Sequence, residues 1–120
     1  MPWYYHQTSG KLYFNAELVA TGYSGAGPWK NNPDAEKLQN QGPIPQGSYR
    51  IGQSFAHPSK GPITMRLSPI GHNAHGRTGF LIHGDSRQHP GQASEGCIVV
   101  GRDVRSRIAA SGDTSLTVRR

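Results

Sequence analysis

A histidine and the chain's only cysteine stand at the ends of two short apolar runs. Residues 80–82 (Phe-Leu-Ile) lead into His83, and Cys97 leads into residues 98–100 (Ile-Val-Val). A cysteine is a good nucleophile only as the thiolate, and its ordinary pKa leaves little thiolate at neutral pH. A neighbouring imidazole can accept the thiol proton. If the two runs form neighbouring strands, the pattern predicts a cysteine acyl-transfer site with His83 as the base.

The residues around this pair offer further groups for acyl transfer. Gly96 lets the backbone approach a substrate closely, and the amides of Gly96 and Cys97 are candidates for an oxyanion hole. Ser94 is expected to hold the turn before the thiol. Asp85 lies two residues after His83, on the same side of an extended chain. We expect it either to orient the imidazole or to bind a substrate amine.

Two other interpretations of these residue types remain open. A lone cysteine before an apolar run is often a small buried hydrophobic residue, which would leave a binding module without catalysis. The other is a metal site, but no pair of its candidate ligands has the tight spacing of common zinc modules. We therefore predict no metal and no cofactor. The candidate ligands are His83, Asp85, His89 and Cys97, with His72 and His75 close in sequence.

The elements that must position these residues are mostly strands. The 120 residues include 16 glycines and 9 prolines, and only 33% are hydrophobic, which favours many short strands and turns in one domain, residues 1–120. An antiparallel meander is expected at the N-terminus. Residues 80–82 are expected to form a strand buried on both faces. The predicted strands are 3–7, 11–14, 18–24, 48–52, 63–67, 80–82, 98–100 and a last one around Leu116 and Val118.

Two long loops and one helix complete the prediction. Residues 25–42 are rich in turn chemistry and are expected to wall a cleft, with one helical turn over residues 34–38. Residues 56–62 and 68–79 are predicted to be loops. Asp103 is the expected N-cap of a helix that contains Val104 and Ile108, and Gly112 is expected to end it.

The net charge limits the classes of partner, and the N-terminal sequence bears on targeting. The formal net charge of +6 favours an anionic partner, which could be nucleic acid, an acidic membrane or an acidic polymer such as a cell wall. No nucleic-acid-binding motif accompanies the basic residues, so we predict no nucleic-acid partner. No run is long enough to span a membrane, and the N-terminus has no signal-peptide pattern. We therefore expect synthesis in the cytoplasm and, if the protein acts outside, export without a signal peptide.

The order of motifs resembles the L,D-transpeptidase (YkuD-like) catalytic domain, and most closely the small L,D-transpeptidase effectors of type VI secretion, the Tlde group. The similarity covers nearly the whole chain. Its segments are 22–25 (Gly-Tyr-Ser-Gly), 31–33 (Asn-Asn-Pro), 42–49 (Gly-Pro-Ile-Pro-Gln-Gly-Ser-Tyr), 76–77 (Gly-Arg), 80–85 and 94–98 (Ser-Glu-Gly-Cys-Ile). The resemblance implies a single-domain, mainly β fold, a β-sandwich or flattened barrel with one or two short helices.

The resemblance also implies a reaction. Cys97 would attack the carbonyl that follows the L-centre of meso-diaminopimelate in a peptidoglycan stem tetrapeptide and release the terminal D-alanine. The thioester would pass to water or to a D-amino acid, with His83 as general base and Ser94, Gly96 and Cys97 at the turn and oxyanion positions. Residues in the matched loop motifs that are expected to contact substrate are Tyr23, Asn32, Arg77 and Glu95.

The chain departs from the broader family beside the nucleophile. That family has a second histidine where this chain has Glu95, and often a polar or basic residue where it has Val99. These differences favour hydrolysis or exchange over wall-building crosslinking. The resemblance further implies a monomeric antibacterial toxin that acts in the periplasm of a target bacterium, with an immunity protein and a component of the secretion machine as partners.

Overall fold

Short strands dominate the computed structural model, which describes residues 2–120. Three-residue 3-10 helices occur in the loops at Gly27–Trp29, Pro33–Ala35 and Ala74–Gly76. The α-helix of the described chain is α1 (Arg102–Ala110). The strands are β1 (Trp3–His6), β2 (Lys11–Phe14), β3 (Glu17–Thr21), β4 (Tyr23–Ser24), β5 (Gly47–Ile51), β6 (Phe55–His57), β7 (Gly61–Ile70), β8 (Leu81–His83), β9 (Ile98–Val99) and β10 (Ser115–Arg119).

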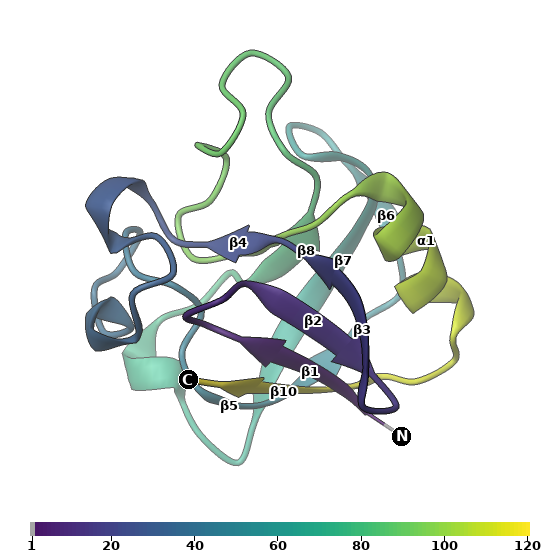
Figure 1. Ribbon diagram of the computed structural model, residues 1–120, viewed down its shortest axis with the longest axis horizontal. Helices are drawn as coiled ribbons and strands as arrows, with labels where there is room; N and C mark the ends of the chain where they lie inside the picture. The colour runs from purple at the N-terminus through teal and green to yellow at the C-terminus, as the bar shows by residue number, and fades with distance from the viewer. Residues whose placement is uncertain (1) are drawn as a thin grey trace.

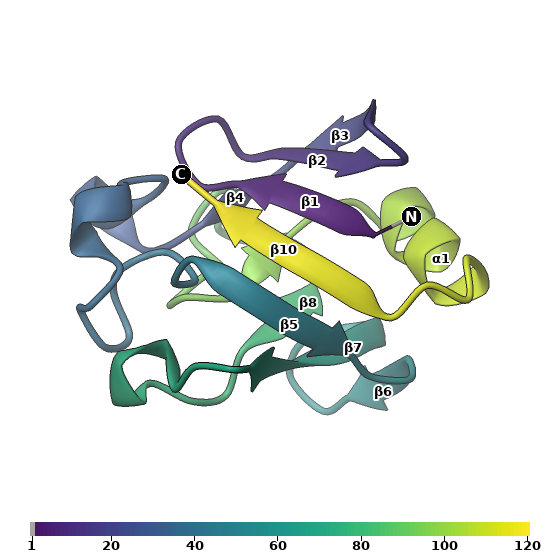
Figure 2. The same cartoon turned by 90° about the horizontal axis from the view of Figure 1, so that it is seen from below.

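The strands form one strongly curved sheet that does not close. Their order is β3-β2-β1-β10-β5-β7-β8-β9-β4, and β6 pairs with β7 off this path. Figure 2 shows β10 between β1 and β5, with the last strand of the chain filling the gap beside the first. The helix α1 packs against β7 at one end of the sheet (Figure 1). The prediction of a mainly β, single-domain fold with a short helix is confirmed.

The core lies on the inner face of the sheet, where the alternating apolar residues of each strand point inward. Trp3 and Tyr5 on β1 are fully buried, and the Trp3 ring stacks on Phe14 with the ring centroids 4.3 Å apart. Leu116 and Val118 on β10 are buried beside them. Burial of aromatic side chains of this size is a large hydrophobic contribution to folding, so these strands anchor the sheet.

The other half of the sheet carries the predicted chemistry. Strands β8 and β9 are parallel neighbours, with Ile82 opposite Ile98 and His83 opposite Val99. All three residues of β8 are buried, as expected for a strand covered on both faces. The connection between the two strands, residues 84–97, projects from the sheet at the top of Figure 1.

Some element boundaries differ from the sequence prediction for local reasons. The predicted strand 18–24 is broken at Gly22, where a Cβ would lie 2.0 Å from the Val99 carbonyl oxygen. The chain passes there from β3 to β4, which pairs with β9. The helical turn predicted over residues 34–38 is present but shorter, because the 3-10 helix spans Pro33–Ala35.

Three further predictions of local structure were wrong. The segment 56–62 is not all loop, because β6 and the first residues of β7 pair as a hairpin. The predicted loop 68–79 begins later, because residues 68–70 belong to β7 and pair with β5. Asp103 is not the N-cap of α1; Gly101 holds that position and Asp103 lies in the first turn. A carboxylate in the first turn still interacts favourably with the helix dipole. Within the described chain, 2–120, no helix is long and apolar enough to cross a membrane.

Candidate active site

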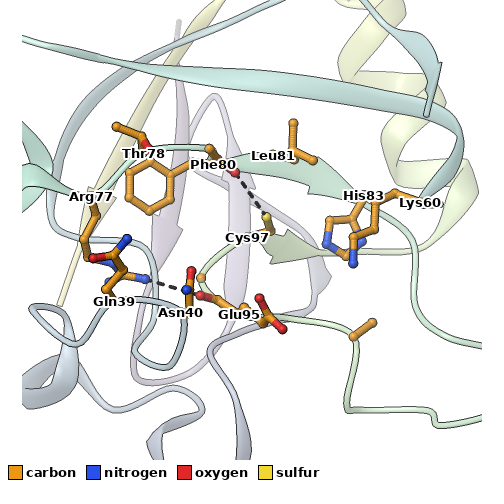
Figure 3. A pocket seen from close by; sticks show the side chains of 13 residues that line it. Gln39, Asn40, Lys60, Arg77, Thr78, Phe80, Leu81, His83, Glu95 and Cys97 are labelled. Carbon is orange, nitrogen blue, oxygen red and sulfur yellow. Dashed lines mark hydrogen bonds between the residues drawn. The ribbon is translucent and has the colours of Figure 1, made fainter. Parts of the chain in front are cut away.

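Two adjacent strand ends bring the cysteine and the histidine to one cavity. Cys97 immediately precedes β9, and His83 is the last residue of β8. Because Cys97 and Val99 share one side of an extended chain, as do Leu81 and His83, both functional side chains face the same side of the sheet. They line a cavity of about 170 Å³ (Figure 3). The predicted juxtaposition of His83 and Cys97 is therefore present.

The contacts of His83 define its tautomer. Its Nδ1 lies 2.7 Å from the carbonyl oxygen of Gly84, which can only accept, so the Nδ1 proton is in place. In the neutral ring Nε2 then carries the lone pair, and this buried atom has no hydrogen-bond partner within residues 2–120. Burial lowers the pKa of His83 and outweighs the Gly84 bond, which raises it. The resting imidazole is a neutral base with an unoccupied acceptor.

The thiol of Cys97 lies in a partly buried position between backbone groups. Its Sγ is 3.8 Å from the carbonyl oxygen of Gly79, and the Leu81 amide donates to it. Burial raises the pKa of Cys97, while the Leu81 amide and the charge of Lys60 lower it. Within the described chain the thiol makes no hydrogen bond to His83. The resting pair is a neutral thiol beside a neutral imidazole, and proton transfer requires Sγ to turn from Gly79 toward the ring.

Ser94 organises the backbone around the nucleophile. Its buried hydroxyl donates to the carbonyl oxygen of Cys97 at 2.6 Å and accepts the amides of Gly25 and Gly96 at 2.9 and 3.1 Å. The expectation that Ser94 holds the turn before the thiol agrees with these contacts. The Gly96 amide donates to Ser94 Oγ in this conformation, so its place in an oxyanion hole stays a prediction that requires this bond to open. The Cys97 amide makes no hydrogen bond to the described residues and is the better donor.

Asp85 ties loops together and does not orient the imidazole. Its carboxylate accepts the Tyr23 hydroxyl at 2.7 Å and the amides of Ser86 and Gly91 at 2.8 and 3.0 Å. These bonds lower its pKa against the opposing effect of burial. The Gly84 carbonyl takes the orienting role that the sequence suggested for Asp85, because the chain leaves the strand after His83 and the carboxylate turns away.

Tyr23, on β4, takes part in the same hydrogen bonds that hold loop 84–97. Its hydroxyl also accepts the amide of Ala93 at 2.8 Å, and Lys30 Nζ lies 4.7 Å from the centre of its ring. Burial and the bond to Asp85 raise the pKa of Tyr23 to about 12. The tyrosine thus fixes both ends of loop 84–97 to β4 and does not line the thiol cavity.

Arg77 and Asn32, two other predicted substrate contacts, are engaged within the protein. The buried Arg77 guanidinium donates to the carbonyl oxygens of Gly42 and Pro43 at 3.0 and 2.8 Å, and more weakly to that of Glu95 at 3.4 Å. It lies at the cavity edge and holds loop 25–42 against the nucleophile loop. The Asn32 side chain caps the 3-10 helix by accepting the Asp34 amide and lies outside the cavity.

Glu95 does line the cavity, as expected, and Lys60 lines it as well. Figure 3 shows Lys60 beside His83, and Glu95 below Cys97. Sequence analysis missed Lys60 because it lies in the β6–β7 turn, far from the nucleophile motif. Gln39 and Asn40 complete the wall from loop 25–42, which agrees with the predicted cleft-wall role of that loop.

The alternative interpretation of these residues as a metal site finds no set of ligands in the described chain. Among residues 2–120, no three His, Cys, Asp or Glu side chains gather closely enough to hold a metal ion. The six histidines are spread over separate elements, and His75 instead pairs with Glu36 at 2.7 Å. The cavity therefore offers thiol and imidazole chemistry from the chain's own residues.

Comparisons with known proteins agree with this site-bearing fold. Two solved structures share it: Bd1075 of Bdellovibrio bacteriovorus, with a TM-score of 0.65 and 15% identity, and the helical cell shape determining protein Pgp2 of Campylobacter jejuni, with a TM-score of 0.60 and 16% identity. The alignments cover 98% of this chain in both cases but only 47% and 46% of those chains, so this chain spans about half their length. No curated protein sequence matches. The Tlde1 domain profile matches residues 19–114, most of the chain, which confirms the resemblance to the Tlde group, and the chain therefore belongs to the Tlde1 domain family.

Proposed function

We propose that this protein is a cysteine-dependent L,D-carboxypeptidase or L,D-transpeptidase that acts on peptidoglycan stem tetrapeptides. One observation carries the proposal: the unpartnered Nε2 of a neutral His83 lies on the strand next to the only cysteine, and both side chains line one cavity. Such a base is required because burial raises the pKa of the Cys97 thiol. Membership of the Tlde1 domain family supports the choice of peptidoglycan as substrate.

The first half-reaction follows from the positions of these two groups. His83 Nε2 takes the thiol proton as Cys97 Sγ bonds to the carbonyl carbon that follows the L-centre of meso-diaminopimelate. The negative charge that develops on the carbonyl oxygen is stabilised by the Cys97 amide. The imidazolium then gives its proton to the leaving nitrogen, the C–N bond breaks, D-alanine departs and a thioester remains on Cys97.

The second half-reaction returns the enzyme to its starting state. His83 accepts a proton from water or from the amine of an incoming D-amino acid as that group attacks the thioester. The C–S bond breaks and the thiol is re-formed with that proton. Water gives the shortened stem peptide, and an amine gives exchange. The lining of the cavity, which includes Lys60 and Glu95, governs which acceptor enters.

The biological setting proposed for this activity is attack on another bacterium. The Tlde1 domain and the net charge of +6 support an antibacterial effector of type VI secretion that reaches an anionic cell wall in the target periplasm. A toxin of this kind requires an immunity protein in the producing cell. We propose that the chain acts as a monomer on the stem peptides.

Mass spectrometry of muropeptides tests the reaction. Purified protein is incubated with disaccharide tetrapeptide, with and without a free D-amino acid, beside the Cys97→Ala and His83→Gln variants. We expect loss of D-alanine or its exchange with the wild type, and none with Cys97→Ala. Turnover that survives in Cys97→Ala would contradict the proposal.

A catalytically inactive wall-binding module is the second candidate. The resting contact of Cys97 Sγ with Gly79, instead of His83, favours it. It predicts that wild type and Cys97→Ala bind isolated sacculi equally and that neither changes the muropeptides. Release of D-alanine by the wild type excludes it.

A further inference from the structure

Arg105 is a buried cation without an acidic partner. Its side chain, on α1, is only 7% exposed. Nε donates to the carbonyl oxygen of Val100 at 3.1 Å, and Nη1 donates to that of Pro62 at 2.7 Å and that of Ile63 at 3.3 Å. Nη2 has no hydrogen-bond partner within residues 2–120, and it lies against Gly84, where a Cβ would approach it to 2.7 Å. The guanidinium is therefore held by backbone carbonyl oxygens and not by a carboxylate of the described residues, and Nη2 remains available to donate.

Arg105 lines a wide groove that opens from the thiol cavity. The groove has a volume of about 820 Å³, and it shares Lys60, Ala93 and Glu95 with the cavity. Its cationic side chains are Lys60, Arg87, Arg102 and Arg105, and His89 also lines it.

Two carboxylates oppose these cations in the groove. Asp85 already accepts two amides and the Tyr23 hydroxyl, and Glu95 lies at the rim shared with the cavity. The groove is therefore positive where Lys60 and Arg105 meet it.

Lys60 stands at the junction between groove and cavity. The turn before it is fixed by His57, whose Nδ1 accepts the amides of Ser59 and Lys60, both at 3.1 Å. The Lys60 side chain itself is exposed, and Figure 3 shows it next to His83. Its charge acts on both catalytic groups, because it lowers the pKa of His83 and that of Cys97. The ammonium is thus within electrostatic reach of the reacting atoms without touching another charged side chain of the described chain.

We propose that Lys60, supported by Arg105, binds the terminal carboxylate of the residue that the enzyme releases. This rests on the proposed function and names how that site recognises its substrate. An enzyme that removes one terminal residue must distinguish a chain end from an internal peptide, and the terminal carboxylate is the group that differs. Charge-assisted hydrogen bonds are the strongest way to read a carboxylate. Glu95 lines the same rim, and its negative charge opposes a carboxylate that approaches on its own side.

The test compares two substrates in the full-length protein. One is the tetrapeptide with a free terminal carboxylate, and the other is the same peptide with a C-terminal amide. The variant is Lys60→Met, which keeps the length of the side chain, and the control is Lys11→Met, an exposed lysine on β2 that removes the same charge. Lys60→Arg tests rescue by another cation. The readout is kcat/KM for release of the terminal residue, separated into kcat and KM.

We expect Lys60→Met to lower kcat/KM on the free acid by about tenfold, mostly through KM, because a hydrogen bond between charged groups is lost. The amide should be a poor substrate of the wild type and nearly insensitive to the mutation. Lys11→Met should leave both unchanged, and Lys60→Arg should recover most of the activity on the free acid.

Two outcomes overturn the inference while leaving the proposed function intact. One is equal turnover of acid and amide by the wild type. The other is an equal loss on both substrates in Lys60→Met, which would mean that the lysine acts on the thiol and not on the substrate. If the wild type releases nothing from either peptide while Cys97→Ala behaves identically, the proposed function itself has failed.

Discussion

The Nδ1 proton of His83 is donated to the carbonyl oxygen of Gly84, the next residue in the chain, at 2.7 Å. The base is therefore oriented by its own backbone, without a carboxylate. A carbonyl cannot take the proton and stabilises the imidazolium less than a carboxylate would. The ring stays neutral until the thiol proton reaches it, so the pair works by general-base catalysis from two neutral groups.

The pH dependence of turnover follows from these two groups. Burial holds the pKa of His83 below its ordinary value of 6.5 and that of Cys97 above its ordinary value of 9.0. We expect kcat/KM to rise with pH through a midpoint below 6.5 and then to remain level through neutral pH. The rate of iodoacetamide labelling of Cys97 should therefore have its midpoint above pH 9. A labelling midpoint below neutral pH would show a preformed thiolate–imidazolium pair instead.

Burial of neutral His83 also couples stability to pH. The folded pKa lies below that of the unfolded chain, so the unfolded chain binds the proton more readily. The stabilisation is complete above about pH 6.5 and is lost as the pH falls through the folded pKa. Urea unfolding between pH 8 and pH 5 should show this loss, and His83→Gln should reduce it. An identical pH slope in the variant would assign the dependence to other groups.

Ser94→Ala should damage stability and activity together. The substitution leaves the amides of Gly25 and Gly96 and the carbonyl of Cys97 without a shared partner in a buried position. Unsatisfied buried groups cost about 1–3 kcal/mol each, so a loss of several kcal/mol in the free energy of unfolding is expected. Ser106→Ala, an exposed serine on α1, is the matched control. Equal unfolding midpoints for the two variants would contradict the bridging role of Ser94.

Gly96→Ala should be far more harmful than the same change at Gly101. Gly96 has a φ of +135°, which side-chain-bearing residues rarely adopt, and its Cβ would lie 2.4 Å from Arg77 Nη2. At Gly101 no atom lies within 4 Å of a Cβ, and φ is −64°. Thermal unfolding and muropeptide turnover of both variants give the comparison. A Gly96→Ala protein with normal activity would mean that the loop repacks without moving Cys97.

Glu95→Gln should change substrate choice and leave the chemistry intact. The Glu95 carboxylate raises the pKa of the Cys97 thiol, so its removal should shift the iodoacetamide labelling midpoint to lower pH. The ratio of hydrolysis to exchange should change, because Glu95 lines the mouth of the cavity. If Glu95→Gln abolishes turnover as completely as Cys97→Ala does, Glu95 takes part in the reaction, and the prediction that it affects only substrate choice is wrong.

Residue types and their spacing within short segments were enough to predict the fold class and the two residues of the candidate catalytic pair. The glycine and proline content and the alternating apolar residues indicated a mainly β domain, and two apolar runs marked β8 and β9, with His83 and Cys97 at their ends. These features depend on side-chain type and spacing within a few residues, which the sequence displays directly. Family motifs then agreed with the profile match over residues 19–114.

Only the tertiary structure decided what surrounds the pair. The sequence distance of two residues suggested that Asp85 orients His83, yet the chain turns after β8 and the Gly84 carbonyl takes that position. Lys60 and Arg105 reach the cavity and its groove from a hairpin turn and from a helix, 37 and 8 residues away from Cys97. The positions of these two side chains depend on the pairing of distant strands and on the packing of α1 against β7. No local sequence pattern specifies either, because the packing energy arises only when the whole sheet has formed.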